Sequence, residues 1–151
     1  MKLRLFIGAL VALLLAAPAA EAKSRSHPHP SKLTPMIFVH GGAGSGGQFE
    51  SQGLRFTSNG YPQRYVRVFE YDSTTAIPNM ATLHTRLDQL IAEVKQQTGK
   101  SKVDILGHSL GTTVMHLYLL DPARAANVAR YVNSTAPRHA CRCLPVCAPL
   151  V

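Results

Sequence analysis

The chain has 151 residues, of which 46% are hydrophobic and 16% are charged, and its formal net charge is +8 at pH 7. This length supports one domain with a buried core. The basic residues are scattered and form no stripe with interleaved aromatic residues, so nucleic-acid binding is not expected. All three cysteines lie in the last eleven residues, which leaves the predicted core free of cysteine.

Residues 1–22 form a predicted signal peptide. Lys2 and Arg4 make its charged start, residues 5–17 its apolar stretch, and residues 20–22 (Ala-Glu-Ala) its cleavage site. The apolar stretch is too short for a comfortable membrane span. We therefore expect a secreted or periplasmic protein with no stable membrane span after cleavage. An uncut signal anchor is the alternative.

Residues 23–35 are rich in serine, proline and histidine and predict an extended linker. His27 and His29 could coordinate a metal ion, but the prolines between and after them favour an extended linker exposed to solvent.

Residues 36–133 alternate predicted strands with predicted helices, as in a parallel sheet. We expect strands at 36–39, 65–69, 103–106 and 128–132, and helices at 48–59, 78–98 and 112–121. The second helix has the clearest apolar period and ends before Gly99, a favourable C-terminal cap. His84 on this helix is expected at the surface. The predicted fold class is α/β, with helices covering both faces of the sheet.

The pentapeptide Gly107-His108-Ser109-Leu110-Gly111 fits the G-x-S-x-G pattern between a strand and a helix. This context is typical of a nucleophile elbow, in which a serine stands on a tight turn with its hydroxyl exposed. A Cβ atom at 107 or 111 would collide where the helix start passes close to the strand. A glycine-rich turn with an incidental serine is the simpler alternative.

A glycine-rich loop, His40 to Gly47, follows the first predicted strand. An H-G-G loop in this position supplies one backbone donor of an oxyanion hole, here Gly42 or a close neighbour. The other donor is the N–H group after the nucleophile, here that of Leu110. His40 is expected to order the turn by hydrogen bonding rather than to act as a base.

These pieces resemble the secreted bacterial lipases and esterases of the α/β-hydrolase superfamily, and their order and spacing resemble the lipase-2-type group. The resemblance rests on four segments: 38–42, 59–62, 103–111 and 129–133. It covers the N-terminal half of a family domain, so it implies a truncated α/β-hydrolase core. It further implies that Ser109 is the nucleophile, that Gly42 and Leu110 form the oxyanion hole, that the substrate is a small-molecule or lipid ester, and that no cofactor is needed.

The acid and histidine partners of this family are not found in their expected order. After Ser109, the only acid is Asp121 and the only histidines are His116 and His139. Asp121 precedes a proline at a helix end, where its expected role is to end the helix. His116 lies two helical turns beyond the serine. His139 follows the last strand too soon. We therefore leave both partners unassigned and expect the chain to be a poor enzyme.

Residues 134–151 form an atypical tail rich in Cys, Pro and Arg, which we interpret as an aberrant ending. A metal site of Cys141, Cys143, Cys147 and His139 is the alternative, but its spacing matches no standard zinc pattern, so no metal is expected.

Two further functional interpretations remain open. Gly42, Gly44 and Gly47 fit G-x-G-x-x-G, with Glu70 placed as a ribose-binding acid, which would indicate a dinucleotide-binding module. A non-catalytic exported fragment is the other alternative.

Overall fold

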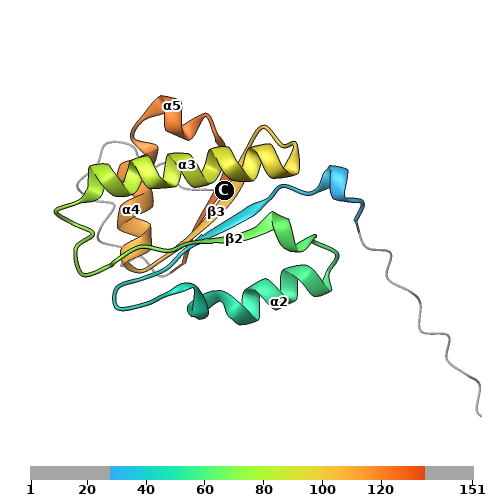
Figure 1. The fold of residues 1–151 in the computed structure, drawn as a ribbon, viewed down its shortest axis with the longest axis horizontal. Helices are drawn as coiled ribbons and strands as arrows, with labels where there is room; N and C mark the ends of the chain where they lie inside the picture. Colours follow the sequence, from blue (N-terminus) through green and yellow to red (C-terminus); the bar gives the residue numbers. More distant parts are fainter. Residues whose placement is uncertain (1–27, 135–151) are drawn as a thin grey trace, which may run out of the picture.

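The structure, a computed structural model, describes residues 28–134 and centres on one parallel sheet (Figure 1). The strand order is β2-β1-β3-β4, and all neighbouring pairs are parallel. The strands are β1 (Met36–Val39), β2 (Val66–Phe69), β3 (Val103–His108) and β4 (Val128–Ser134). The α/β fold class predicted from the sequence is confirmed. The predicted signal peptide, residues 23–27 of the predicted linker and residues 135–151 of the tail lie outside the described residues.

Helices cover the sheet on two sides, α2 on one and α3 with α4 on the other (Figure 1). The α-helices are α2 (Glu50–Ser58), α3 (Met80–Thr98), α4 (Leu110–Leu119) and α5 (Pro122–Ala125). Short 3-10 turns are η1 (Pro30–Lys32), η2 (Gly46–Phe49) and η3 (Gln63–Tyr65). Across residues 28–134, no helix combines the length and apolar character that crossing a membrane requires.

The side chains of β1 alternate between the two helical layers, because successive residues of a strand point to opposite faces. Ile37 and Val39 pack in the larger core cluster with α3 and α4. Met36 and Phe38 pack with Phe49 in a smaller cluster, which the half-buried Phe56 of α2 joins. Both faces of β1 are therefore buried, and this central strand holds the two layers together.

The N-terminal edge of the fold begins inside the predicted linker. Residues 30–32 form η1, and Leu33 and Pro35 are buried. The Pro35 carbonyl accepts a hydrogen bond from the Asp104 N–H at 2.8 Å, which ties this segment to β3. Residues 33–35 are thus packed rather than solvated.

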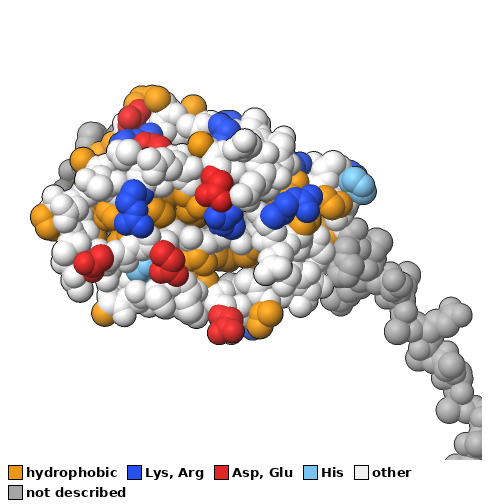
Figure 2. All heavy atoms as spheres, viewed as in Figure 1, with side chains coloured by type: hydrophobic (Ala, Val, Ile, Leu, Met, Phe, Trp, Pro, Cys, Tyr) orange, Lys and Arg blue, Asp and Glu red, His pale blue; other side chains and the backbone are white. Residues whose placement is uncertain are grey.

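The face shown in Figure 2 mixes basic and acidic side chains over α2, β2 and α3. One ion pair joins β2 to α3, with Arg67 Nη2 3.0 Å from a Glu93 carboxylate oxygen. Both side chains are partly exposed, so water screens their attraction and the pair adds little to stability.

The prediction that His84 lies at the surface of α3 is wrong. His84 follows the buried Leu83, and its side chain lies where α4 packs on α3, leaving the residue 6% exposed. Its Nε2–H donates to the Val114 carbonyl at 3.1 Å, and Arg124 Nη1 lies 3.3 Å from Nδ1. The apolar spacing along α3 identifies the main face that this helix buries. It does not show that α4 also covers neighbouring positions of α3, such as His84.

Acidification is expected to destabilise the protein through His84. Burial holds the pKa of His84 below its usual 6.5, and the charge of Arg124 lowers it further, although the hydrogen bond to Val114 opposes both effects. Below that usual value the unfolded chain binds the proton more readily than the native protein does, so stability falls as the pH falls. The fall in Tm between about pH 7 and pH 5 should be smaller in His84→Gln than in the wild type. In His29→Gln, which changes an exposed histidine, it should be unchanged; equal falls in all three proteins would contradict the prediction.

Candidate active site

Ser109 is the single residue between the end of β3 and the start of α4, and it is exposed. Its backbone has φ 51° and ψ −119°, a positive φ that non-glycine residues rarely adopt. Such strain costs on the order of 1–3 kcal/mol and is sustained only when surrounding contacts fix the turn. Here the N–H and the hydroxyl of Thr112 both donate to the Ser109 carbonyl, at 2.9 and 2.7 Å.

Two glycines allow the helix after Ser109 to pass close to the sheet. A Cβ atom at Gly111 would lie 2.3 Å from the Val39 carbonyl oxygen, closer than any real contact. A Cβ atom at Gly107 would lie 3.0 Å from the Gly111 carbonyl oxygen. The strand-to-helix turn therefore depends on missing side chains, above all at Gly111.

The glycine loop after β1 meets this turn, because β1 and β3 are parallel neighbours whose carboxyl ends share one edge of the sheet. An ideal Cβ atom at Gly41 would lie 3.0 Å from the Ser109 Cβ atom. The corresponding point at Gly42 lies 4.0 Å from the Leu110 side chain. The fold thus brings together Gly42, Ser109 and Leu110, which the sequence resemblance placed in one site.

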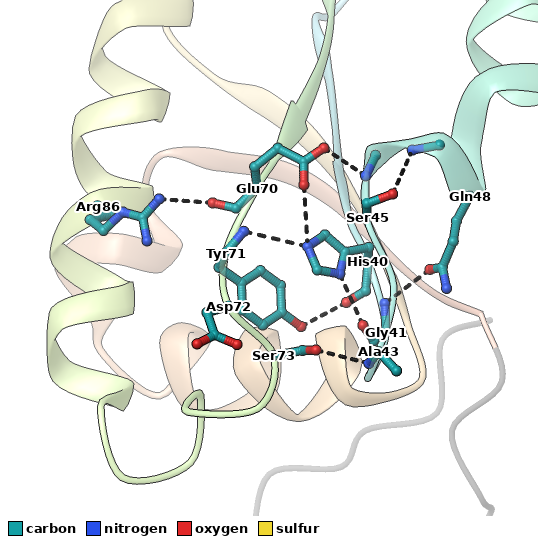
Figure 3. Close-up of polar contacts among 12 residues, drawn as sticks. His40, Gly41, Ala43, Ser45, Gln48, Glu70, Tyr71, Asp72, Ser73 and Arg86 are labelled. Atoms are coloured by element: carbon teal, nitrogen blue, oxygen red, sulfur yellow. Dashed lines mark hydrogen bonds and ion pairs between the residues drawn. The ribbon is translucent and has the colours of Figure 1, made fainter.

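Most backbone N–H groups of the oxyanion loop, defined as residues 41–47, already have acceptors (Figure 3). The Gly41 N–H donates to Gln48 Oε1 at 3.1 Å, that of Ala43 to Ser73 Oγ at 2.8 Å, and that of Gly46 to Glu70 Oε1 at 2.6 Å. The remaining bonds use acceptors within the loop: Gly44 to the Gly41 carbonyl and Gly47 to Ser45 Oγ.

The N–H groups of Gly42 and Leu110 have no hydrogen-bond partner among residues 28–134. Leu110 opens α4, where the first N–H groups of a helix have no partner within the helix. Leu110 follows Ser109 in the chain, and Gly42 follows Gly41, whose ideal Cβ position lies 3.0 Å from the Ser109 Cβ atom. Two such donors can together stabilise a negative oxygen that forms beside the serine hydroxyl.

His40 fixes the start of the loop and is fully buried. Because a carbonyl only accepts, His40 Nδ1–H is the donor to the Gly41 carbonyl, at 2.9 Å. The Tyr71 ring stacks on the imidazole with centroids 4.3 Å apart, and its hydroxyl donates to the His40 carbonyl at 2.7 Å. Burial raises the pKa of Tyr71 to about 12, so the hydroxyl keeps its proton at neutral pH. The expectation that His40 orders this turn by hydrogen bonding is confirmed.

Among residues 28–134, no side chain that could act as a base lies against the Ser109 hydroxyl. The Ser109 hydroxyl has no hydrogen bond within residues 28–134. His116 lies beside β4, with Nε2 3.5 Å from Asn133 Nδ2, and His108 Nδ1 is buried without a partner. Asp121 caps α5 by accepting from the Ala123 N–H at 2.8 Å, which confirms its predicted structural role. His139 lies outside the described residues.

The sequence patterns did not reveal the side chains that organise the loop: Gln48, Glu70 and Ser73 accept hydrogen bonds from its N–H groups, and the Tyr71 hydroxyl donates to the His40 carbonyl. Glu70 was considered only as a ribose-binding acid of a dinucleotide site. In the structure its carboxylate accepts from the Gly46 N–H of the same glycine-rich loop. Glu70, Tyr71 and Ser73 lie just after β2, at the edge of the sheet where the β1 loop also lies, whereas Gln48 lies in η2, next to the loop in the chain.

Metal chemistry has no candidate cluster in the described part of the chain. Among residues 28–134, no three His, Cys, Asp or Glu side chains lie close enough to hold an ion. The alternative metal site in the tail falls outside these residues.

A comparison with protein-family models gives a match to part of the chain. The family model described as "Lipase (class 2)" matches residues 33–124, which include both the oxyanion loop and the turn at Ser109. A search of curated proteins found no match. The family match extends over more than half of the chain.

Proposed function

This chain belongs to the class 2 lipase family, whose members are hydrolases of the lipase and esterase type, and we propose that Ser109 is its nucleophile toward carboxylic esters. The observation that carries the proposal is the pair of unpartnered N–H groups, on Gly42 and Leu110, beside an exposed serine in a strained turn. A backbone strained in this way is typical of sites that hold a reacting group in place.

In the proposed reaction, the Ser109 hydroxyl oxygen attacks the ester carbonyl carbon and the carbonyl oxygen becomes an oxyanion. The hydroxyl proton passes through solvent water to the alcohol oxygen that will leave. The Gly42 and Leu110 N–H groups donate to this oxyanion, and loss of one such donor typically costs ~10²–10³ in rate. Collapse of the intermediate expels the alcohol and leaves an acyl group on Ser109, which water then removes. The substrate class is a small-molecule or lipid ester.

We further propose that residues 28–134 do not supply the acid and histidine partners of a complete triad. Support comes from the absence of any described side chain hydrogen-bonded to the Ser109 hydroxyl and from the structural role of Asp121. With nucleophile and oxyanion donors alone, we expect slow acyl transfer. Enzymes from which triad residues have been removed still react about 10³–10⁴ times faster than the uncatalysed reaction in water. The predicted signal peptide supports export to the periplasm or the medium.

The test is to expose the full chain to 4-nitrophenyl butyrate, measuring nitrophenolate release and locating the acyl group by mass spectrometry. We expect slow release with the acyl group on Ser109, and no acylated protein in Ser109→Ala. Ser101→Ala, which removes an exposed serine at the opposite edge of the sheet, should behave as the wild type.

Two results would contradict parts of the proposal. Equal release by the wild type and Ser109→Ala would remove the nucleophile assignment and favour a non-catalytic exported fragment. Rapid multiple turnover that depends on Ser109 would mean that a base and an acid are present, and would overturn the incomplete triad.

A further inference from the structure

We propose that Glu70 is the positioning residue of the oxyanion loop, holding the loop so that the Gly42 N–H faces the reacting carbonyl. The inference rests on the proposed function of Ser109. Glu70 is the first residue after β2, and its carboxylate lies over the loop that follows the neighbouring strand β1 (Figure 3).

The Glu70 carboxylate contacts the far end of the loop directly, although its side chain is 61% exposed. Its Oε1 accepts from the Gly46 N–H at 2.6 Å, a short bond to a charged acceptor, which is stronger than a neutral one. A Cβ atom at Gly46 would lie 2.3 Å from the same oxygen, so a side chain at position 46 would force the carboxylate away from this position. The sequence therefore pairs an acid with a glycine at this point.

The other carboxylate oxygen reaches the beginning of the loop. Oε2 lies 3.5 Å from His40 Nε2, and His40 Nδ1–H holds the Gly41 carbonyl at 2.9 Å. The His40 contact is attractive only when the imidazole is protonated, so the bond to Gly46 carries the main part of the role. Glu70 thus hydrogen-bonds the loop at Gly46 and lies beside His40, the residue before the loop, whose Nε2 accepts from the Tyr71 N–H at 3.4 Å.

Glu70 is itself held in place by α3. Arg86 Nη2 donates to the Glu70 carbonyl at 2.9 Å, and its guanidinium lies 5.7 Å from the centre of the Phe69 ring. These contacts fix the backbone from which the carboxylate extends. The carboxylate that holds Gly46 therefore takes its position from β2 and α3.

The loop needs such an anchor because five of its seven residues are glycine. Glycine loses more conformational freedom on ordering than any other residue, so an unanchored loop would sample many positions. An oxyanion donor accelerates the reaction only if it is aligned before the charge develops. Anchoring Gly46 while leaving the Gly42 N–H unpartnered meets both requirements.

The experiment compares the full chain with Glu70→Ala, Glu70→Gln and the control Glu93→Ala. Glu93 is a similarly exposed acid that pairs with Arg67 across β2 and α3, away from the loop. Two quantities are measured: the rate constant for acylation of Ser109 at saturating 4-nitrophenyl butyrate, with its half-saturation concentration, and the hydrogen-exchange protection of the Gly46 N–H by NMR.

We expect Glu70→Ala to lower the acylation rate constant about tenfold. This effect is smaller than the ~10²–10³-fold loss of rate that follows removal of an oxyanion donor itself. The half-saturation concentration should stay unchanged, because the donor acts in the transition state. Gly46 protection should be lost in this variant. Glu70→Gln keeps an acceptor for Gly46 and should recover most of the rate and the protection. Glu93→Ala should match the wild type.

A Glu70→Ala rate equal to that of the wild type would overturn the inference while leaving the role of Ser109 intact. An equal loss in Glu70→Gln and Glu70→Ala, or in Glu93→Ala, would overturn it as well, because it would indicate a general effect of lost charge. Failure of the proposed function is recognised separately, by wild-type reactivity that matches Ser109→Ala.

Discussion

Gly111→Ala is expected to destabilise the protein by about 3 kcal/mol and to abolish acylation of Ser109. The added Cβ would lie 2.3 Å from the Val39 carbonyl oxygen and 2.6 Å from that of His40. Val39 is the last residue of β1 and His40 follows it, so the clash is with backbone atoms. It can be relieved only if α4 moves away from the sheet. That movement would displace Leu110 and the strained turn at Ser109.

Gly53→Ala is the matched control, because Gly53 also lies inside a helix, α2. Its added Cβ would meet only Val66 Cγ1, at an ordinary 3.8 Å. Alanine is the better helix former, so this variant should be more stable by roughly 0.5–1 kcal/mol. Urea unfolding measures both variants. A stabilising effect at 111 would contradict the packing of α4 against β1.

Phe38→Ala is expected to cost about 3–5 kcal/mol of unfolding free energy, the usual range for truncating a buried phenylalanine. Phe38 is 1% exposed and is the centre of the smaller core cluster. Its ring stacks on Phe49 with centroids 4.7 Å apart and meets Phe56 edge-on at 5.8 Å. Removing it takes away the main contact that holds η2 and α2 on the sheet.

Two further variants separate cavity formation from a general loss of apolar surface. Phe38→Leu keeps most of the buried volume and should cost clearly less than Phe38→Ala. Leu54→Ala changes a side chain of α2 that is 61% exposed and should stay within about 0.5 kcal/mol of the wild type. The changes in unfolding free energy of the three variants are obtained from their denaturant midpoints, with the same dependence of free energy on denaturant concentration in each. A similar loss in Leu54→Ala and Phe38→Ala would contradict the assigned core.

The strands and the long helix could be predicted from the sequence because their signals are local. The apolar period of residues 80–94 and the cap at Gly99, with φ 68°, describe α3 well. The predicted helix over 48–59 begins instead as the 3-10 turn η2. The error at His84 has a tertiary cause, since its burial depends on where α4 and Arg124 pack.

The sequence alone determined the order of strands and helices, the family resemblance and the turn that carries Ser109, because periodicity and short motifs depend on neighbours in the chain. Only the tertiary structure decided that β1 lies between β2 and β3, and so which loops share an edge. That adjacency brings Gly42 to Ser109, and Glu70 and Ser73 to the oxyanion loop. These contacts join residues 24 or more positions apart, and no local pattern specifies them, because they arise when the parallel strands align.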